Sequence, residues 1–239
     1  MWKITRCVEP EWLDALPADD PRAVRSRRDL RWINACMLQS AIMARALTRS
    51  GVYRQPCTLL DLGAGDGTFM LRVAQRLASV WPDVTVILLD RQNIISAETR
   101  RSFRALQWNV ETISADAFDF LEHAPLSQVD IVTANLFLHH FSREPLARLL
   151  ALAANRTRLF VACEPRRAPH ALTTSRLLWA IGCNAVSRHD ALVSVCAGFS
   201  GSELSSLWPA NGEWIIHEQL AIPFSHCFVA RRVPSDATQ

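Results

Sequence analysis

The residues best suited to chemistry are three glycines at every second position, Gly63, Gly65 and Gly67, bracketed by Asp61 and Asp66. An apolar run ends on Asp61, and a pattern of helical period begins after Gly67, so the glycines lie in a turn between a strand and a helix. Glycine allows a ligand to approach the backbone closely. The two carboxylates disfavour a pyrophosphate and favour a cationic ligand with hydroxyl and ammonium donors.

The spacing of these glycines also separates the turn from a dinucleotide-binding loop. That loop has the pattern G-x-G-x-x-G, in which a pyrophosphate lies on the helix amino terminus. In this chain the pattern is D-L-G-A-G-D-G. An NAD-dependent oxidoreductase is therefore the weaker of the two ligand-binding interpretations.

The elements that position this turn alternate between short β-rich runs and helical patterns. Continuous apolar strands separated by helices predict a doubly wound α/β fold, with a mostly parallel sheet whose ligand sites lie at the strand carboxyl ends. The expected strands begin with TLLDL, VTVILLD, VETIS, VDIVTA and RLFVAC, and the helices between them span 67–79, 93–106, 117–123 and 143–154.

Segments outside this alternation predict a helical cap and a closing hairpin. Residues 1–55 are expected to form an amino-terminal lid with one long helix over 21–49, and 56–239 a domain with an inserted helical cap at about 166–199. SELSSLWP predicts a short helix, and EWIIHEQLAI and SHCFVARR predict two strands joined by a turn near Pro223. A hairpin at the end of a parallel sheet makes the last strand antiparallel.

Composition narrows the class of protein. With 49% hydrophobic and 21% charged residues, the chain is typical of a globular protein, and a net charge of +3 without charged blocks disfavours nucleic-acid binding. Seven scattered cysteines without a CxxC pair predict neither disulfides nor a zinc site, so no metal is expected. We see no signal peptide and no membrane-length segment, which indicates a cytoplasmic protein; an oligomer is compatible with the sequence.

The glycine turn resembles the first motif of class I S-adenosylmethionine-dependent methyltransferases, and the similarity extends over about 58–164. The resemblance implies a Rossmann-like seven-stranded sheet with S-adenosylmethionine as cofactor. Asp61 belongs to this motif, and Gly63 and Gly65 would pass close under the methionine part of the cofactor. A tight turn without a ligand is the alternative.

The resemblance also implies roles for residues after the second strand. Asp90 would accept both ribose hydroxyls, although it could instead cap the next helix, a duty that Asn93 could share. Arg91 would flank the adenine.

After the third strand, Asp116 would receive the adenine amino group, with Asp119 as a competitor, and the Ala117 N–H would meet a ring nitrogen. Asn135, in ANLFLHHF after the fourth strand, would bond the cofactor's amino group or simply satisfy its own loop. This segment lacks N/D-P-P-Y and resembles the LHH segment of small-molecule methyltransferases.

Histidine suits proton removal because its unperturbed pKa is about 6.5. His139 and His140 are adjacent, so one is expected to face the pocket while the other is structural. His189 forms a candidate pair with Asp190, unless Ser187 caps a helix with Asp190 completing the capping box.

The sequence thus predicts an enzyme that methylates a small, hydrophobic or carrier-bound molecule. We expect O-methylation of a phenol or enol from a polyketide-like or quinone-like pathway. C-methylation of a similar ring is the alternative, and so is a non-catalytic scaffold of the same fold.

Overall fold

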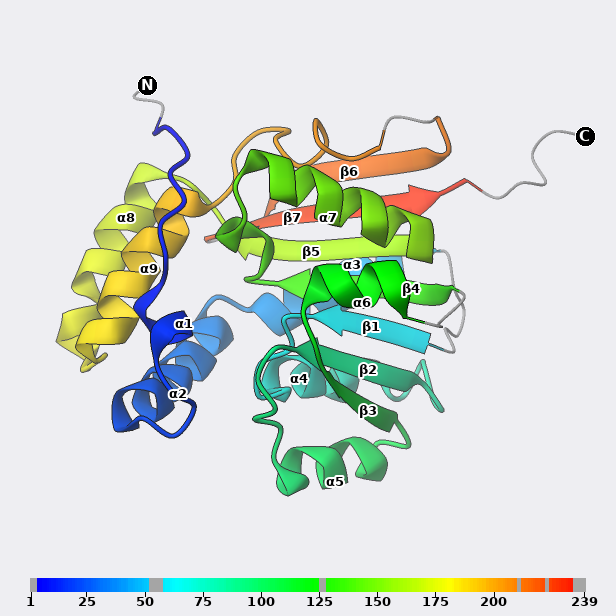
Figure 1. Ribbon diagram of the computed structural model, residues 1–239, viewed down its shortest axis with the longest axis horizontal. Helices are drawn as coiled ribbons and strands as arrows, with labels where there is room; N and C mark the ends of the chain where they lie inside the picture. The colour runs from blue at the N-terminus through cyan, green and yellow to red at the C-terminus, as the bar shows by residue number, and fades with distance from the viewer. Residues whose placement is uncertain (1–3, 52–57, 125–127, 210–211, 222–223, 234–239) are drawn as a thin grey trace, which may run out of the picture.

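The computed structural model describes residues 4–51, 58–124, 128–209, 212–221 and 224–233. Within these ranges seven strands form one sheet in the order β3-β2-β1-β4-β5-β7-β6 (Figure 1). Strands β1 to β5 pair in parallel, and β7 is antiparallel to both β5 and β6. The predicted sheet and its antiparallel last strand are therefore confirmed. The strands are β1 Thr58–Leu62, β2 Thr85–Asp90, β3 Asn109–Ser114, β4 Val129–Asn135, β5 Thr157–Pro165, β6 Trp214–Ala221 and β7 Ser225–Arg232.

Helices cover both faces of the sheet because successive strand residues point to opposite sides. In β1, Leu59 is buried in the layer with α3 (Gln39–Arg49), α4 (Thr68–Leu77) and α5 (Ala97–Ala105). The next residue, Leu60, is buried with α6 (Ala117–His123) and α7 (Arg143–Arg156). This explains why the strands read as continuous apolar runs.

A second group of helices lies beside the carboxyl ends of the parallel strands, at the left of Figure 1. It contains α1 (Trp12–Ala15), α2 (Pro21–Cys36), α8 (Pro169–Arg176) and α9 (Ala185–Ala197), and both α1 and α2 pack against α9. Two short 3-10 helices, η1 (Leu138–His140) and η2 (Leu177–Ile181), complete the elements. Among the described residues no helix is long and apolar enough to cross a membrane.

The prediction of one helix over 21–49 is wrong. The structure ends α2 at Cys36 and begins α3 at Gln39, with Leu38 in the left-handed region at φ 55°. The break has a packing cause, since α2 contacts α9 in the helical group whereas α3 packs on β5 and α4. One straight helix could not serve both directions.

The short helix predicted for SELSSLWP is also wrong, because residues 201–207 form turns. The carboxylate of Glu218 accepts the N–H groups of Leu204 and Ser205 at 3.1 and 2.7 Å. A side chain from β6 thus fixes the start of this segment, which continues as turns and not as a regular helix. The predicted turn near Pro223 falls outside the described residues.

Candidate active site at the carboxyl ends of the strands

The glycine turn joins β1 to α4 with all three glycines at positive φ, 69° at Gly63, 56° at Gly65 and 74° at Gly67. Positive φ strains residues that carry a Cβ, which accounts for the alternate spacing. The N–H groups of Gly63 and Ala64 both donate to the carbonyl of Leu89, at 2.9 and 3.0 Å. The turn is therefore fixed to the end of β2, and a Cβ on Gly65 would have no atom within 4 Å.

Asp90 braces this turn from the end of β2. Its Oδ2 accepts the N–H of Gly65 and its Oδ1 accepts the N–H of Gln92, both at 2.8 Å. Each carboxylate oxygen has a second lone pair, so two acceptor sites remain for a ligand. The alternative that Asp90 or Asn93 caps the next helix is wrong, because Ser96 caps α5 through a bond from the Thr99 N–H.

The two aspartates of the glycine motif have different surroundings. Asp61 is buried and accepts a hydrogen bond of 2.7 Å from the Thr133 hydroxyl. Burial raises the pKa of Asp61 to about 7 against the opposing effect of that bond. Asp66 instead accepts bonds from Thr68 and pairs with Arg31 at 3.4 Å. Asp66 is thus already paired with a cation, whereas Asp90 and, when ionised, Asp61 are available to a cationic ligand.

Asn135 ends β4 opposite Cys163 of β5. Its Oδ1 is buried and has no hydrogen-bond partner among the described residues. An unsatisfied buried acceptor costs about 1–3 kcal/mol, so this oxygen would be stabilised by a hydrogen bond from a bound donor. Two residues later, the Phe137 ring lies against the glycine turn, where a Cβ on Gly63 would come within 2.4 Å of it.

The segment after Asn135 is organised by a carboxylate at the end of β5. Glu164 is fully buried, and its oxygens accept the N–H groups of Phe137, Leu138 and His139 at 3.0, 2.9 and 3.3 Å. The same carboxylate lies 2.8 Å from Nδ1 of His139. One side chain therefore fixes both the η1 backbone and the orientation of the His139 ring.

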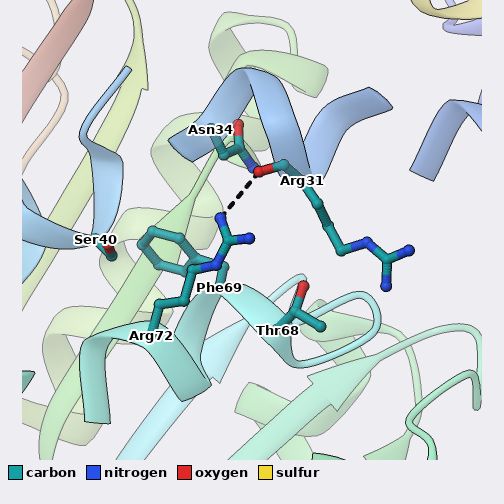
Figure 2. A pocket seen from close by; sticks show the side chains of 6 residues that line it. All are labelled: Arg31, Asn34, Ser40, Thr68, Phe69 and Arg72. Atoms are coloured by element: carbon teal, nitrogen blue, oxygen red, sulfur yellow. Dashed lines mark hydrogen bonds between the residues drawn. The ribbon is translucent and has the colours of Figure 1, made fainter. Parts of the chain in front are cut away.

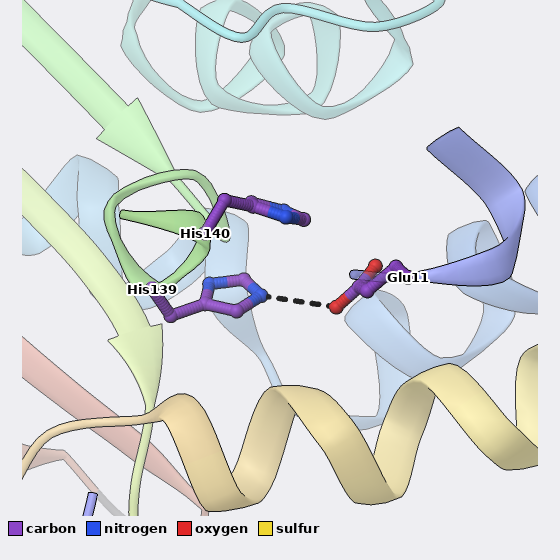
Figure 3. Close-up of side chains that lie close together, drawn as sticks. All are labelled: Glu11, His139 and His140. Atoms are coloured by element: carbon purple, nitrogen blue, oxygen red, sulfur yellow. Dashed lines mark hydrogen bonds and ion pairs between the residues drawn. The ribbon is translucent and has the colours of Figure 1, made fainter. Parts of the chain in front are cut away.

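The second ring nitrogen of His139 contacts the amino-terminal segment. The Nε2 atom of His139 lies 3.3 Å from Oε1 of Glu11, as Figure 3 shows. Burial disfavours the charged ring, but the hydrogen bonds to Glu11 and Glu164 outweigh it and raise the pKa of His139 to about 9. In this arrangement His139 keeps its proton at neutral pH, so it is not a free base.

His140 differs from its neighbour in every respect that matters for chemistry. Its side chain is 25% exposed, against 3% for His139, and its Nδ1 lies 3.5 Å from Asp14. Burial and the adjacent His139 charge lower its pKa. The two adjacent histidines thus have different environments, one enclosed by carboxylates and one partly exposed.

Comparison with known proteins now bears on these features. Residues 59–158 match a family model described as a methyltransferase domain. Residues 59–158 thus form a methyltransferase domain. This match covers the glycine turn, Asp90, Asn135 and both adjacent histidines, and it confirms the family that the sequence resembles.

Solved structures resemble this chain at low identity. An O-methyltransferase family protein from Burkholderia thailandensis aligns with 92% of this chain and 62% of its own, at 18% identity and a TM-score of 0.61. The plantazolicin methyltransferase BpumL, in complex with a monoazolic desmethylPZN analog and SAH, aligns with 90% of this chain and 91% of its own, at 12% identity and a TM-score of 0.62. Magnesium protoporphyrin IX methyltransferase from Synechocystis PCC 6803, with bound SAH, aligns with 92% of this chain and 91% of its own, at 12% identity and a TM-score of 0.54.

These similarities establish the fold of the chain. The chain spans 62% of the length of the Burkholderia protein. No curated protein matches it.

The residues expected at the adenine lie at the neighbouring strand end. Asp116 caps α6, accepting the Phe118 N–H at 2.8 Å, and Ala117 is the first residue of that helix. Arg91 is exposed, and its carbonyl accepts the Ser114 hydroxyl at 3.0 Å. Asp119 is also exposed. The structure thus brings Asp90, Arg91 and Asp116 to one edge of the sheet, and their roles toward adenine stay predictions.

His189 lies on α9 and contacts α1 within the helical group. Its ring stacks on Trp12 with centroids 3.8 Å apart, and its Nδ1 lies 2.9 Å from Asp190. Asp190 also accepts the N–H groups of Trp12 and Leu13. The alternative in which Ser187 caps this helix is wrong, because Asn184 is the cap.

Sequence reasoning missed Glu11, which proves to be the partner of His139. The two residues are 128 positions apart, and no local pattern distinguishes Glu11 from an exposed acid. Its carboxylate also accepts the Ser194 hydroxyl of α9. Glu11 therefore links the amino-terminal segment, the η1 segment and α9.

A small pocket between α2, α3 and α4 lies apart from these residues (Figure 2). Within it, Arg72 donates to the carbonyl of Arg31 at 2.9 Å. Asp90, Asn135 and His139 do not border this pocket, so we assign it no part in methyl transfer. It is lined by Arg31, Asn34, Ser40, Thr68, Phe69 and Arg72.

Proposed function

We propose that the chain transfers a methyl group from S-adenosylmethionine to an oxygen of a small-molecule acceptor, a phenol or an enol. The observation that carries the proposal is the unpartnered Asn135 oxygen beside a glycine turn braced by Asp90. Their position at the carboxyl ends of the parallel strands supports a ligand with an ammonium group at one end and ribose hydroxyls at the other.

The residues present fit this cofactor. Asn135 offers an acceptor to the amino group, Asp90 keeps two lone pairs for the ribose, and the open side of Gly65 admits a close ligand. Asp61 supplies buried negative charge toward a cation. When bound, the cofactor supplies an activated methyl group on a positive sulfur.

The acceptor would lie where the amino-terminal segment and the α8–α9 region meet the η1 segment. Arg6 donates to the carbonyls of Ala197 and Phe141, and Arg167 donates to the carbonyl of Ile4. These contacts join both parts of the helical group across the strand ends, which supports the proposed lid over 1–55 and cap over 166–199. Enclosure excludes water and aligns the acceptor, which can supply several kcal/mol of the barrier.

The proposal is tested by incubating the pure protein with S-adenosylmethionine and a panel of phenols, enols and C-nucleophilic rings. We expect S-adenosylhomocysteine to form only with an oxygen acceptor, with the methyl located on oxygen by mass spectrometry and NMR. A methyl group found on carbon would show that the chain catalyses C-methylation and not O-methylation. Cofactor binding without turnover across the panel would support a scaffold.

Asp90→Ala should weaken S-adenosylhomocysteine binding by about 1–3 kcal/mol, because the variant loses charge-assisted bonds and frees the Gly65 N–H. By calorimetry the dissociation constant should rise about 5- to 150-fold. Glu111→Ala, which alters an exposed carboxylate on β3, is the control and should bind normally. An unchanged constant for the Asp90 variant would remove Asp90 from the site.

Cofactor affinity should increase with pH because Asp61 titrates near pH 7. A cationic ligand favours the ionised carboxylate, so binding is weakest where Asp61 is protonated and tightens as the pH rises through its pKa. Calorimetry with S-adenosylhomocysteine should show about tenfold tighter binding at pH 7 than at pH 5.5. Asp61→Asn retains an acceptor for Thr133 and should abolish this dependence; the same slope in the variant would disprove the linkage.

A further inference from the structure

Three potential metal ligands converge where the amino-terminal segment crosses the η1 helix. A carboxylate oxygen of Glu11 and one ring nitrogen each of His139 and His140 all lie within 4.8 Å of one another. Figure 3 shows the three side chains directed toward a common region. No metal was expected from the sequence because that expectation rested only on the spacing of the cysteines, and none of these three residues is a cysteine.

The closest pair already has the separation of two ligands on one ion. Two donors at about 2.1 Å from a tetrahedral zinc lie roughly 3.4 Å apart. The Glu11 Oε1 to His139 Nε2 distance is 3.3 Å. The His140 ligand nitrogen lies within 4.8 Å of both atoms, so its ring must move inward to reach the same ion, and its side chain is 25% exposed.

The surroundings of His139 match those of a metal-bound histidine. Such a ring usually donates its other N–H to a carboxylate, which fixes the tautomer and directs the free lone pair at the ion. Glu164 is that carboxylate, 2.8 Å from Nδ1, and three backbone N–H groups hold it in place. The Nε2 atom is thereby aimed at Glu11, where a cation would replace the proton shared by the two groups.

The site is also enclosed enough to retain an ion. The His139 side chain is 3% exposed and that of Glu11 is 10% exposed. The Ser194 hydroxyl donates to Glu11, so the carboxylate is oriented by a second group. A buried, oriented carboxylate with two imidazoles is a donor set that suits Zn²⁺, Fe²⁺, Mn²⁺ or Co²⁺.

We propose that Glu11, His139 and His140 bind one divalent transition-metal ion, with Glu164 as the positioning carboxylate behind His139. Three protein ligands leave at least one coordination position open, as in metal sites that act on substrates. The ion's binding is independent of the proposed function, but its use rests on that function. The open position would take the acceptor's hydroxyl oxygen and make that hydroxyl more acidic.

The chemistry balances without a free histidine base. The hydroxyl proton passes to water as the oxygen binds the ion. The oxygen–methyl bond then forms while the sulfur–methyl bond breaks, and the sulfur keeps the electron pair of the broken bond. A bound ion would also hold the amino-terminal segment against the η1 helix, because Glu11 of that segment would be one of its ligands.

The test measures metal binding to chelator-treated protein with Co²⁺ as a visible probe and Zn²⁺ by calorimetry. We expect one ion per chain, with the absorption that Co²⁺ acquires in a protein site of low coordination number. Glu11→Gln and His140→Ala should each weaken binding about tenfold or more, and Glu164→Gln about 10- to 100-fold. His123→Ala, on α6 outside the cluster, is the matched control and should bind normally.

Circular dichroism of each variant will verify folding. If Glu164→Gln is unstable, Glu11→Gln and His140→Ala still test the site. No ion bound by the wild type, or unchanged affinity in both Glu11→Gln and His140→Ala, would overturn the site. S-adenosylhomocysteine calorimetry on the same samples separates the outcomes. Cofactor binding without metal binding rejects only the metal site, and metal binding without cofactor binding rejects only the proposed function.

Discussion

Glu164→Ala should lower the free energy of unfolding by about 3–5 kcal/mol, because it removes one partner of a buried charged pair. The variant leaves the protonated His139 ring facing only Glu11 and deprives three buried backbone N–H groups of their acceptor. Urea denaturation followed by circular dichroism measures the loss. The η1 segment should also lose order, so cofactor binding should weaken together with stability.

Two further variants separate the carboxylate's charge from its bulk. Glu164→Gln keeps the shape and one acceptor oxygen, so it should destabilise the protein less than alanine does. Glu111→Ala removes an exposed carboxylate from β3 and should change stability by less than about 0.5 kcal/mol. Equal stability of the Glu164→Ala and Glu111→Ala variants would show that the buried network contributes nothing.

Gly63→Ala should destabilise the protein by about 2–5 kcal/mol, from two additive causes. A left-handed backbone at φ 69° costs an L-residue about 1–2 kcal/mol, and overpacking typically costs about 1–3 kcal/mol. The new Cβ would lie 2.4 Å from Cδ2 of Phe137. Since Phe137 precedes η1, its displacement should also weaken S-adenosylhomocysteine binding in calorimetry.

Gly65→Ala is the matched control for the steric cause. Its φ of 56° is similar, yet its Cβ would meet no atom within 4 Å, so only the backbone cost remains. Adding Phe137→Ala to Gly63→Ala should restore part of the loss, because the clash disappears while the backbone strain persists. If Gly63→Ala and Gly65→Ala are equally stable, contact with Phe137 does not explain why residue 63 is glycine.

The sequence was most informative where the cause of a structure is local. The glycine spacing predicted a strand-to-helix turn because positive φ is a property of single residues. The apolar runs predicted the sheet because a strand buried on both faces needs apolar residues throughout. Asp90 was predicted at the strand end, and the structure adds its bond to the Gly65 N–H.

Local patterns failed where a distant partner changed the outcome. The periodicity over 21–49 continues through Leu38, but packing on different parts of the molecule divides the helix there. The segment 202–209 has helical character, yet it forms turns whose Leu204 and Ser205 N–H groups are held by Glu218 of β6. In both cases the competing contacts come from elements that the local sequence does not contain.

The sequence by itself determined the sheet, the glycine turn and the resemblance to methyltransferases, because those features depend on residues a few positions apart. Only the tertiary structure decided the surroundings of the two adjacent histidines. His139 lies 25 positions from Glu164 and 128 from Glu11, and both carboxylates reach its ring. Charge and burial at a ring nitrogen depend on what folding brings within about 4 Å, and chain separation carries no information about that contact.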